Sequence, residues 1–357
     1  MIILGSTGSI GVNALAIAER FSLNVEALVA GNSIDRLNQQ IAKHRPNWVV
    51  IANEADIPRV NHPNVLSGEE AILRVIEEAD SEFVVNALVG FLGLRPTLKA
   101  LERGKKVALA NKESLVAAGA FIDTSRIHPI DSEHFGLWYL LNESRPVKKM
   151  TITASGGAFR DWPLEKLAAA TLEDALKHPN WSMGQKITID SASMMNKLFE
   201  LLEARWLFGE LDYDAIIETR SLIHAFVDFA DGSTTAHIAG ANMQLPIAYA
   251  LMGKVEEQIL EPVDLLKVGG LEFREITQER YPVWQIKEAL LREPQRGAVV
   301  NAANEAAIAQ FIAGKIGFLD ISRRVVDAFE HFDRVPGSVE EVFAIDEEVR
   351  AYVGAMS

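Results

Sequence analysis

Residues 2–11 read Ile-Ile-Leu-Gly-Ser-Thr-Gly-Ser-Ile-Gly, and this stretch decides the fold class. The short apolar run predicts a strand, and a helix over Val12–Phe21 follows the glycine-rich segment directly. In such a unit the first glycine makes a tight turn, the second lets the backbone approach a pyrophosphate, and the third permits close packing of helix on strand. A plain glycine turn is the alternative, but strand, loop, helix and second strand stand in the order of a dinucleotide site. We therefore assign six residues to cofactor binding: Gly5, Ser6, Thr7, Gly8, Ser9 and Ile10.

The end of the second strand indicates which dinucleotide is bound. It reads Val-Ala-Gly31-Asn32-Ser33, without the Asp or Glu that usually binds the ribose 2′-hydroxyl of NAD. Asn32 and Ser33 could donate to a 2′-phosphate, with Arg36 nearby, which favours NADP over NAD. Alternatively, these residues only form the turn and cap the next helix. On the first interpretation Gly31, Asn32 and Ser33 join the cofactor site.

The alternation of secondary structure predicts an α/β fold. Short β-rich apolar runs alternate with helical patterns through residue 120, which is typical of a parallel sheet with helices on both faces. We expect a Rossmann-like NADPH-binding domain over residues 1–120 and an α+β catalytic domain over 121–255. Residues 256–282 read as an irregular linker, and 283–357 predict a small C-terminal helical bundle.

Several elements are expected inside the two later regions. The catalytic region should contain a helix near residues 193–208 and strands at Thr151–Thr153, Ile187–Ile189, Ile216–Ile217 and Phe226–Phe229. In the C-terminal region, Ser338 and Glu341 have the spacing of a capping box before the last helix.

The composition excludes several classes of protein. The 357 residues include no cysteine, so disulfides and thiolate catalysis are excluded and any metal must be held by oxygen or imidazole. A formal net charge of −14 argues against nucleic acid as the main partner. The longest apolar run, around Phe83–Leu94, is far shorter than the roughly 20 residues of a membrane span. No basic segment precedes an apolar stretch at the N-terminus, so we expect a cytoplasmic protein without a membrane partner.

Asn111, Lys112 and Glu113 follow the fifth expected strand. Ligands bind at the carboxyl ends of strands in open parallel sheets, so we assign all three residues to the cofactor site. A solvated helix start is an equally good interpretation of the spacing.

Asp131-Ser132-Glu133-His134 places two carboxylates two residues apart. In an extended segment such side chains point the same way and could converge on one cation. The alternative is a charged loop that faces water.

Asn196, Lys197 and Glu200 share a stripe on the helix expected beyond Ser193. Lys197 and Glu200 could form a weak ion pair on a wet face. The functional alternative is a polar face turned to a site, with Glu200 as a third carboxylate.

Two loops complete the set of candidates. Ser155-Gly156-Gly157 could cradle an anion with backbone N–H groups, or could be a simple glycine turn. A second loop, about residues 177–187, carries Trp181 and Met183 and predicts a mobile flap that excludes water. A packed turn with Trp181 in the core is the alternative.

Together these segments resemble the 1-deoxy-D-xylulose-5-phosphate reductoisomerase family, which is NADPH- and metal-dependent and belongs to the non-mevalonate isoprenoid pathway. The resemblance covers essentially the whole chain, and its long run from His178 to Glu200 is specific. The matching segments are LGSTGSIG (4–11), ALANKESL (108–115), DSEH (131–134), SGG (155–157), HPNWSMG (178–184), DSASMMNK with its following glutamate (190–200), ARWLF (204–208) and NAANE (301–305).

The resemblance implies roles for individual residues. It gives the divalent metal, Mg²⁺ or Mn²⁺, the ligands Asp131, Glu133 and Glu200. It implies that the sugar phosphate substrate is held by Ser132, Ser155, His178, Trp181, Met183, Ser191, Asn196 and Lys197, of which Trp181 and Met183 belong to the flap. Catalytic roles fall to Lys197, His134 and Glu133, and we assign Gly184 to the cofactor site.

The resemblance also implies the reaction. The metal would chelate the substrate ketone and a neighbouring hydroxyl as a Lewis acid. Rearrangement of 1-deoxy-D-xylulose 5-phosphate to a branched aldehyde, by retro-aldol cleavage and re-addition, is followed by hydride transfer from NADPH. The product is 2-C-methyl-D-erythritol 4-phosphate, and Lys197 could balance negative charge that develops on oxygen. A homodimer is implied as well.

The chain departs from the family pattern at three motif positions and in the segment after His134, which is shorter than in many relatives. Many relatives have HPQS where this chain has Glu-Thr-Arg-Ser at 218–221, and PDMR where it has Ala-Asn-Met-Gln at 241–244. Many also have a lysine at the position of Asn32. Other interpretations explain less. A semialdehyde dehydrogenase needs a cysteine nucleophile, a homoserine dehydrogenase leaves the three carboxylates and the flap unexplained, and a non-catalytic NADP sensor would be expected to lose its metal ligands.

Overall fold

A computed structural model of the chain describes residues 1–141 and 145–356. Its contacts divide the chain into two compact units. The first unit comprises Met1–Asn111, Ile122–Asp131 and Asn242–Leu260, and the second comprises Lys112–Phe121, Ser132–Ala241 and Glu261–Ser357.

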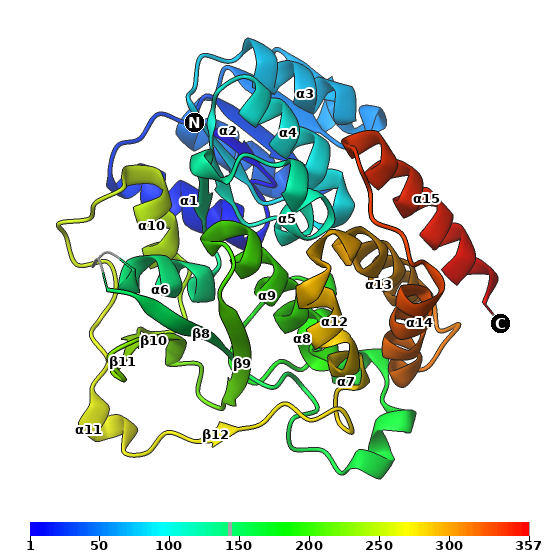
Figure 1. The fold of residues 1–357 in the computed structure, drawn as a ribbon. Coiled ribbons are helices and arrows are strands. Elements are labelled where there is room, and N and C mark those ends of the chain that lie inside the picture. The colour runs from blue at the N-terminus through cyan, green and yellow to red at the C-terminus, as the bar shows by residue number, and fades with distance from the viewer. Residues whose placement is uncertain (142–144, 357) are drawn as a thin grey trace. The chain divides into compact units, whose positions relative to one another are not determined.

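The first unit is a seven-stranded parallel sheet in the order β4-β3-β2-β1-β5-β6-β7, with helices around it (Figure 1). Ile2, Ile3 and Leu4 of β1 are fully buried, as a central strand of a parallel sheet requires. The strands are β1 (Ile2–Leu4), β2 (Ala27–Ala30), β3 (Trp48–Ile51), β4 (Val65–Ser67), β5 (Phe83–Asn86), β6 (Lys106–Leu109) and β7 (Ile127–Pro129). The helices are α1 (Ser9–Arg20), α2 (Ile34–His44), α3 (Glu69–Glu78), α4 (Leu94–Glu102) and α10 (Gln244–Met252). The Rossmann-like prediction is confirmed.

The second unit contains a five-stranded mixed sheet in the order β11-β10-β8-β9-β12. β8 pairs parallel with β9 and antiparallel with β10, which confirms an α+β arrangement. The strands are β8 (Val147–Ala154), β9 (Asp212–Glu218), β10 (Ile223–Phe229), β11 (Thr234–Ile238) and β12 (Phe273–Arg274). The helices that precede residue 261 in this unit are α5 (Lys112–Ala118), α6 (Ser132–Leu140), α7 (Leu172–Ala175), α8 (Gln185–Ser193) and α9 (Met195–Phe208).

The C-terminal part of the second unit is helical, as predicted. Figure 1 shows α13, α14 and α15 packed together in orange to red. Ser338 caps α15: its Oγ accepts from Glu341 N at 3.3 Å, while Glu341 Oε2 accepts from Gly337 N at 2.7 Å. The helices are α11 (Leu265–Val268), α12 (Lys287–Arg292), α13 (Gly297–Ile312), α14 (Phe318–His331) and α15 (Val339–Ala355).

Two expectations about local structure were wrong. The Ile187–Ile189 strand is instead part of α8, because Lys186 and Asp190, one helical turn apart, pair at 2.8 Å and Thr188 Oγ1 donates to Gly184 O. β-Branched residues favour strands only weakly. Distant partners of α8, Glu113 paired with Lys186 and Asn304 bonded to Asp190, override that preference. The expected linker 256–282 is not wholly irregular either, since β12 within it pairs with β9.

Two segments belong to units other than those that the sequence suggested. The helix α10, from the region expected to be catalytic, lies beside α1 (Figure 1), and its Ile247 and Ala248 are buried in the core of the first unit. The helix α5, expected in the Rossmann-like domain, belongs to the second unit because it packs on α9 and α13.

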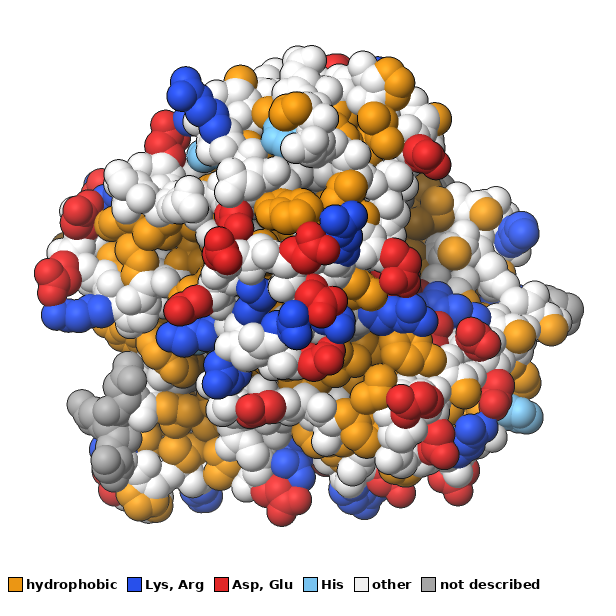
Figure 2. All heavy atoms as spheres, turned by 90° about the horizontal axis from the view of Figure 1, so that it is seen from above, with side chains coloured by type: hydrophobic (Ala, Val, Ile, Leu, Met, Phe, Trp, Pro, Cys, Tyr) orange, Lys and Arg blue, Asp and Glu red, His pale blue; other side chains and the backbone are white. Residues whose placement is uncertain are grey.

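Charged side chains of both signs are interspersed on the face shown in Figure 2. Several exposed helices of the first unit carry ion pairs, such as Lys43–Glu19 at 2.6 Å and Arg74–Glu78 at 2.8 Å. Pairs of this kind contribute little to stability because water screens them. The apolar cores therefore stabilise the fold, and, across the part of the chain that is described, no helix is both long and apolar enough to cross a membrane.

Replacing Gly297 by alanine should destabilise the second unit. A Cβ there would lie 2.1 Å from the backbone oxygen of Val116, where α13 crosses α5. Overpacking of this kind costs about 1–3 kcal/mol. Gly354→Ala is the matched control, because a Cβ at that helical position meets no atom within 4 Å. Chemical denaturation should show a loss only for Gly297→Ala, and equal stabilities would contradict the packing argument.

Candidate active site

The glycine-rich loop of the first unit has the backbone that its sequence predicts. Gly5 has φ +82°, and a Cβ there would lie 2.6 Å from Ala87 O. A Cβ on Gly11 would lie 2.3 Å from Gly5 O, so only glycine allows α1 to approach the loop this closely. Gly8 and Ser9 are exposed at the N-terminus of α1, where backbone N–H groups can receive an anion.

The loops after β1 and β5 leave the sheet side by side, because these two parallel strands are neighbours. From β1 the chain continues to β2 and β3 on one side of the sheet, and from β5 it continues to β6 and β7 on the other side. Nucleotides bind at such a switch point. Gly31, Asn32 and Ser33 are exposed at the end of the adjacent β2. Arg36 reaches the same loop, where its Nη1 donates to Thr7 O at 2.9 Å. Val89, in the loop after β5, is 67% exposed, a feature that the sequence pattern did not indicate.

Asn111 is buried and supports a loop. Its Nδ2 donates to Leu88 O at 2.9 Å and to Gly90 O at 2.8 Å. A Cβ on Gly93 would lie 2.2 Å from its Cγ. The side chain therefore shapes the loop that follows β5, and its contact with the cofactor remains a prediction.

The second unit buries a cluster of charged groups around Lys197 and Glu200. Lys197 Nζ lies 2.8 Å from Glu133 Oε1 and 2.5 Å from Glu200 Oε2. Glu200 Oε1 also accepts from Lys112 Nζ at 3.0 Å and from Asn196 Nδ2 at 2.5 Å. Lys112 Nζ donates to Asn196 Oδ1 at 2.8 Å, which closes the network.

Burial and pairing act against each other in this cluster. Desolvation alone would raise the pKa of Glu133, but the Lys197 ammonium and His224 hold that pKa well below its ordinary value. Burial would likewise lower the pKa of Lys197, but the carboxylates of Glu133 and Glu200 raise it. The pairing therefore favours the charged forms of Glu133 and Lys197.

The structure overturns three interpretations of these residues. Asp131 and Glu133 do not lie in an extended segment, because α6 begins at Ser132 and residues two apart on a helix point in different directions. Lys197 and Glu200 are not a wet pair, since their side chains are 5% and 2% exposed. Lys112 and Glu113 are not a solvated helix start, because both are buried.

Lys112 and Glu113 contact other helices of the second unit. Lys112 reaches Asn196 and Glu200 of α9, the residues predicted to hold substrate and metal. Glu113 Oε1 accepts from Lys186 Nζ at 2.6 Å, and Lys186 pairs with Asp190 as well. Their assignment to the cofactor remains a prediction that these contacts do not test.

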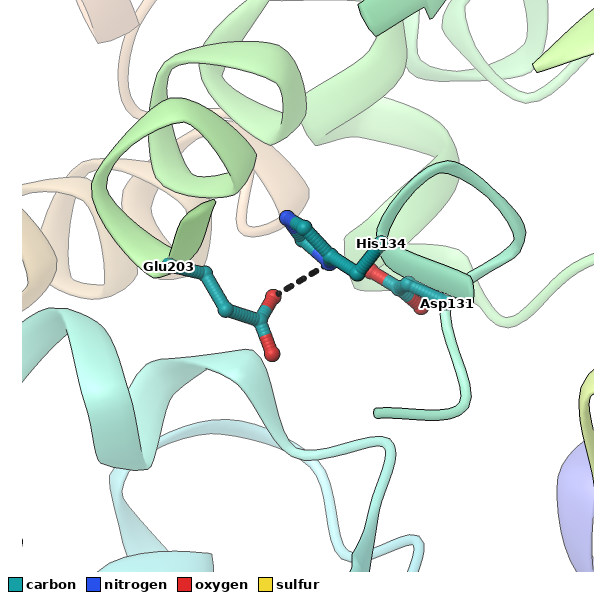
Figure 3. A group of neighbouring side chains, drawn as sticks. All are labelled: Asp131, His134 and Glu203. Atoms are coloured by element: carbon teal, nitrogen blue, oxygen red, sulfur yellow. Dashed lines mark ion pairs between the residues drawn. The ribbon is translucent and has the colours of Figure 1, made fainter. Parts of the chain in front are cut away.

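The His134 ring is buried and contacts two groups of α9, the side chain of Glu203 and the backbone of Glu200. Its Nδ1 pairs with Glu203 Oε2 at 3.2 Å, and its Nε2 lies 2.8 Å from the backbone oxygen of Glu200. Figure 3 shows the Glu203 carboxylate pointing to the His134 ring. Glu203 was missed, although it lies one helical turn beyond Glu200.

Ser155, His178 and Ser191 converge in the second unit. His178 Nε2 lies 2.8 Å from Ser155 Oγ and 3.1 Å from Ser191 Oγ. Its Nδ1 accepts from the backbone N–H of Trp181 at 2.9 Å. Burial, with Arg160 and Lys197 nearby, lowers the pKa of His178 to about 4. The ring is therefore neutral at pH 7, with its proton on Nε2, and the three side chains offer hydrogen bonds to an anion.

The SGG segment allows this convergence. Gly156 and Gly157 have φ +85° and +69°, and a Cβ on Gly157 would lie 2.5 Å from Ser191 O. The turn thus brings the end of β8 against α8. Gly157 N donates to Ser155 Oγ at 3.1 Å, which supports the interpretation as a turn, and the anion cradle remains a prediction.

Trp181 and Met183 of the expected flap are half-buried, and Gly184 is exposed at the N-cap of α8. The Trp181 ring packs edge-on against His224, with centroids 6.4 Å apart. Trp181 is therefore not a core residue, and movement of the flap remains a prediction.

Three family models match the chain. The model of 1-deoxy-D-xylulose 5-phosphate reductoisomerase matches residues 1–119, and models of its C-terminal domains match residues 127–208 and 238–352. A relative named 1-deoxy-D-xylulose 5-phosphate reductoisomerase from Nautilia profundicola is 58% identical over 360 residues, covering 99% of this chain and 98% of the relative. One of the same name from Wolinella succinogenes is 53% identical over 355 residues, with 99% of each chain covered.

Solved structures agree. A DOX-P reductoisomerase in complex with NADPH, fosmidomycin and magnesium aligns with a TM-score of 0.92 at 31% identity, covering 99% of this chain and 97% of that one. The enzyme of Zymomonas mobilis in complex with NADPH gives a TM-score of 0.87 at 35% identity, with the same coverage. With its parallel nucleotide-type sheet and its buried carboxylate–lysine cluster, this chain belongs to the 1-deoxy-D-xylulose 5-phosphate reductoisomerase family.

Proposed function

We propose that the chain converts 1-deoxy-D-xylulose 5-phosphate to 2-C-methyl-D-erythritol 4-phosphate, using NADPH and one divalent metal ion. Membership of the reductoisomerase family supports this activity. The observation that carries the proposal is that Glu133 and Glu200, from different helices, converge on one positive group, the Lys197 ammonium. The site thus combines oxygen ligands with cations suited to an anionic, oxygen-rich substrate.

Asp131, Glu133 and Glu200 are proposed to hold the metal. Carboxylate oxygens suit Mg²⁺ and Mn²⁺, and two of these carboxylates already flank a cationic group. Ser132 Oγ donates to Glu133 Oε2 at 2.7 Å and so orients that carboxylate. When bound, the ion supplies Lewis-acid polarisation of the substrate carbonyl.

Lys197 and Lys112 supply the positive charge of the site. Each ammonium donates to Glu200 and, being fixed by buried carboxylates, offers preorganised stabilisation to negative charge on substrate oxygen. The contacts of Lys112 favour a place beside the substrate over one beside the nucleotide. His134, held between Glu203 and the Glu200 carbonyl, positions α9.

The substrate phosphate is proposed to bind at Ser155, His178 and Ser191. Asn196, which precedes Lys197 in the sequence, is proposed to contact the substrate as well. Hydroxyl groups and a neutral imidazole N–H can donate hydrogen bonds to phosphate oxygens. Trp181 and Met183 would cover this pocket. NADPH would lie at the loop Gly5–Ile10 of the first unit, with the Arg36 guanidinium available to its 2′-phosphate.

Manganese as a working metal, a homodimer and a cytoplasmic location are further proposals. The oxygen donor set supports manganese as well as magnesium. The family resemblance supports the dimer and the cytoplasmic location.

The function is tested by following NADPH absorbance with 1-deoxy-D-xylulose 5-phosphate. We expect oxidation of NADPH in the presence of Mn²⁺, its loss on addition of EDTA, and its return when Mn²⁺ is restored in excess. Folded protein that binds NADPH but oxidises none under these conditions would refute the proposal.

Glu200→Gln should fold but lose metal-dependent turnover. The amide keeps the volume of the side chain but removes a charged ligand, so kcat should fall roughly a hundredfold or more at ordinary Mn²⁺. Glu210→Gln is the control, because that side chain is 87% exposed and pairs only with Arg205 among the ion pairs of the described residues. Kinetics of Glu200→Gln that match those of the control would refute the ligand assignment.

His178 should not titrate near neutrality. Its pKa in the folded chain, about 4, lies below the ordinary 6.5, so its contribution to stability is present above pH 6.5 and is lost as the pH falls towards 4. In histidine-selective NMR the signal of the His178 ring is identified by its absence in His178→Gln. Between pH 8 and 5.5 the chemical shift of that signal should not change. A midpoint near 6.5 would show that the ring is solvated.

A further inference from the structure

Glu218, one of the departures from the family pattern, is a fully buried carboxylate at the end of β9. Its Oε1 accepts from Arg220 N at 2.8 Å, and its Oε2 accepts from Leu222 N at 2.7 Å and Ile223 N at 3.2 Å. Among the described residues, no ion pair involves Glu218. Three backbone N–H groups therefore compensate the buried charge, and in return the carboxylate fixes the turn between β9 and β10.

The turn that Glu218 fixes holds two side chains from elsewhere in the second unit. Thr219 O accepts from Arg160 Nη1 at 2.9 Å and from Asn180 Nδ2 at 3.0 Å. Ser221 Oγ accepts from the same Asn180 nitrogen at 2.7 Å. Ser221 has φ +55°, a left-handed conformation that a non-glycine residue adopts only when its surroundings impose it.

Asn180 and Arg160 lead from this turn to the proposed phosphate pocket. Asn180 is the third residue of the His178–Gly184 segment, and its backbone N–H donates to His178 Nδ1 at 3.2 Å. Arg160 Nη1 donates to Ser155 O at 2.8 Å as well as to Thr219 O. The carboxylate of Glu218 is thus connected by direct hydrogen bonds, through one turn, to the segments that carry His178 and Ser155.

We propose that Glu218 is a positioning residue for recognition of the substrate phosphate. It does not touch the substrate. Its carboxylate sets the 219–223 turn, and that turn fixes Asn180 and Arg160, so that His178 and Ser155 face the phosphate together. The proposal rests on the proposed function, because it assumes that this pocket binds the phosphate of 1-deoxy-D-xylulose 5-phosphate.

Glu218→Gln is the sharpest substitution. Glutamine has the same shape, but its NH₂ group would face one of the backbone N–H groups that donate to the carboxylate. The turn could then not keep all three hydrogen bonds. KM for 1-deoxy-D-xylulose 5-phosphate should rise about tenfold, the scale set by loss of a charge-assisted hydrogen bond, while kcat and KM for NADPH change little. Glu218→Asp, which keeps the charge on a shorter side chain, should give a smaller rise and covers the case in which the glutamine variant does not fold.

Glu26→Gln is the matched control. Glu26 is also a buried carboxylate that accepts from backbone N–H groups, those of Asp80 and Ser81 at 3.0 and 2.8 Å, but it lies in the first unit. The Glu26→Gln variant should lower the melting temperature, as is expected of Glu218→Gln, but should leave KM for the sugar phosphate unchanged. A double-mutant cycle with Asn180→Ala adds the connection: the two KM effects should be far less than multiplicative.

Hydrogen exchange gives a readout that does not depend on turnover. Peptides covering residues 178–184 and 219–223 should exchange faster in Glu218→Gln or Glu218→Asp than in wild type or Glu26→Gln. If wild type fails to oxidise NADPH with the substrate, the proposed function fails, while the exchange result still tests positioning. Unchanged KM and unchanged exchange in a folded Glu218 variant, or independent effects in the cycle, would overturn the proposal.

Discussion

The buried pairing of Lys197 with Glu133 and Glu200 is the interaction on which the site depends. Each of these charges would be costly to bury alone, and each is tolerable because the others lie within hydrogen-bond distance. The pairing joins α6 to α9, and Lys112 extends it to α5. The same electrostatic requirement that holds three helices together therefore leaves a group of preorganised charges, which is what catalysis on an anionic sugar phosphate needs.

Close approach of backbone to backbone is the second requirement, and glycine meets it in both units. Gly11 lets α1 approach the loop after β1, and Gly157 lets the end of β8 approach α8. In each case a Cβ would overlap backbone atoms, which cannot move aside as a flexible side chain can. The nucleotide-type loop and the Ser155–His178–Ser191 group thus depend on the same property of glycine, in a parallel sheet and in a mixed one.

Glu218 organises the turn between β9 and β10 through its own hydrogen bonds. A carboxylate at the end of β9 satisfies the N–H groups of its own turn, so this short segment is defined by local hydrogen bonds rather than by a particular family motif. The turn then presents Thr219 O and Ser221 Oγ, a carbonyl and a hydroxyl oxygen, to Asn180.

Local patterns along the chain were enough to predict the parallel sheet, the nucleotide loop and the charged candidate residues, because strand–glycine–helix order and apolar runs are local properties. It could not decide that Ile187–Ile189 is helical, that α10 joins the first unit, or that Glu203 pairs with His134, since each depends on partners distant in the chain. Whether Lys197 and Glu200 were a wet pair or a buried one was equally open. Only the tertiary structure decided it, because desolvation is set by what packs around a side chain and not by its spacing along a helix.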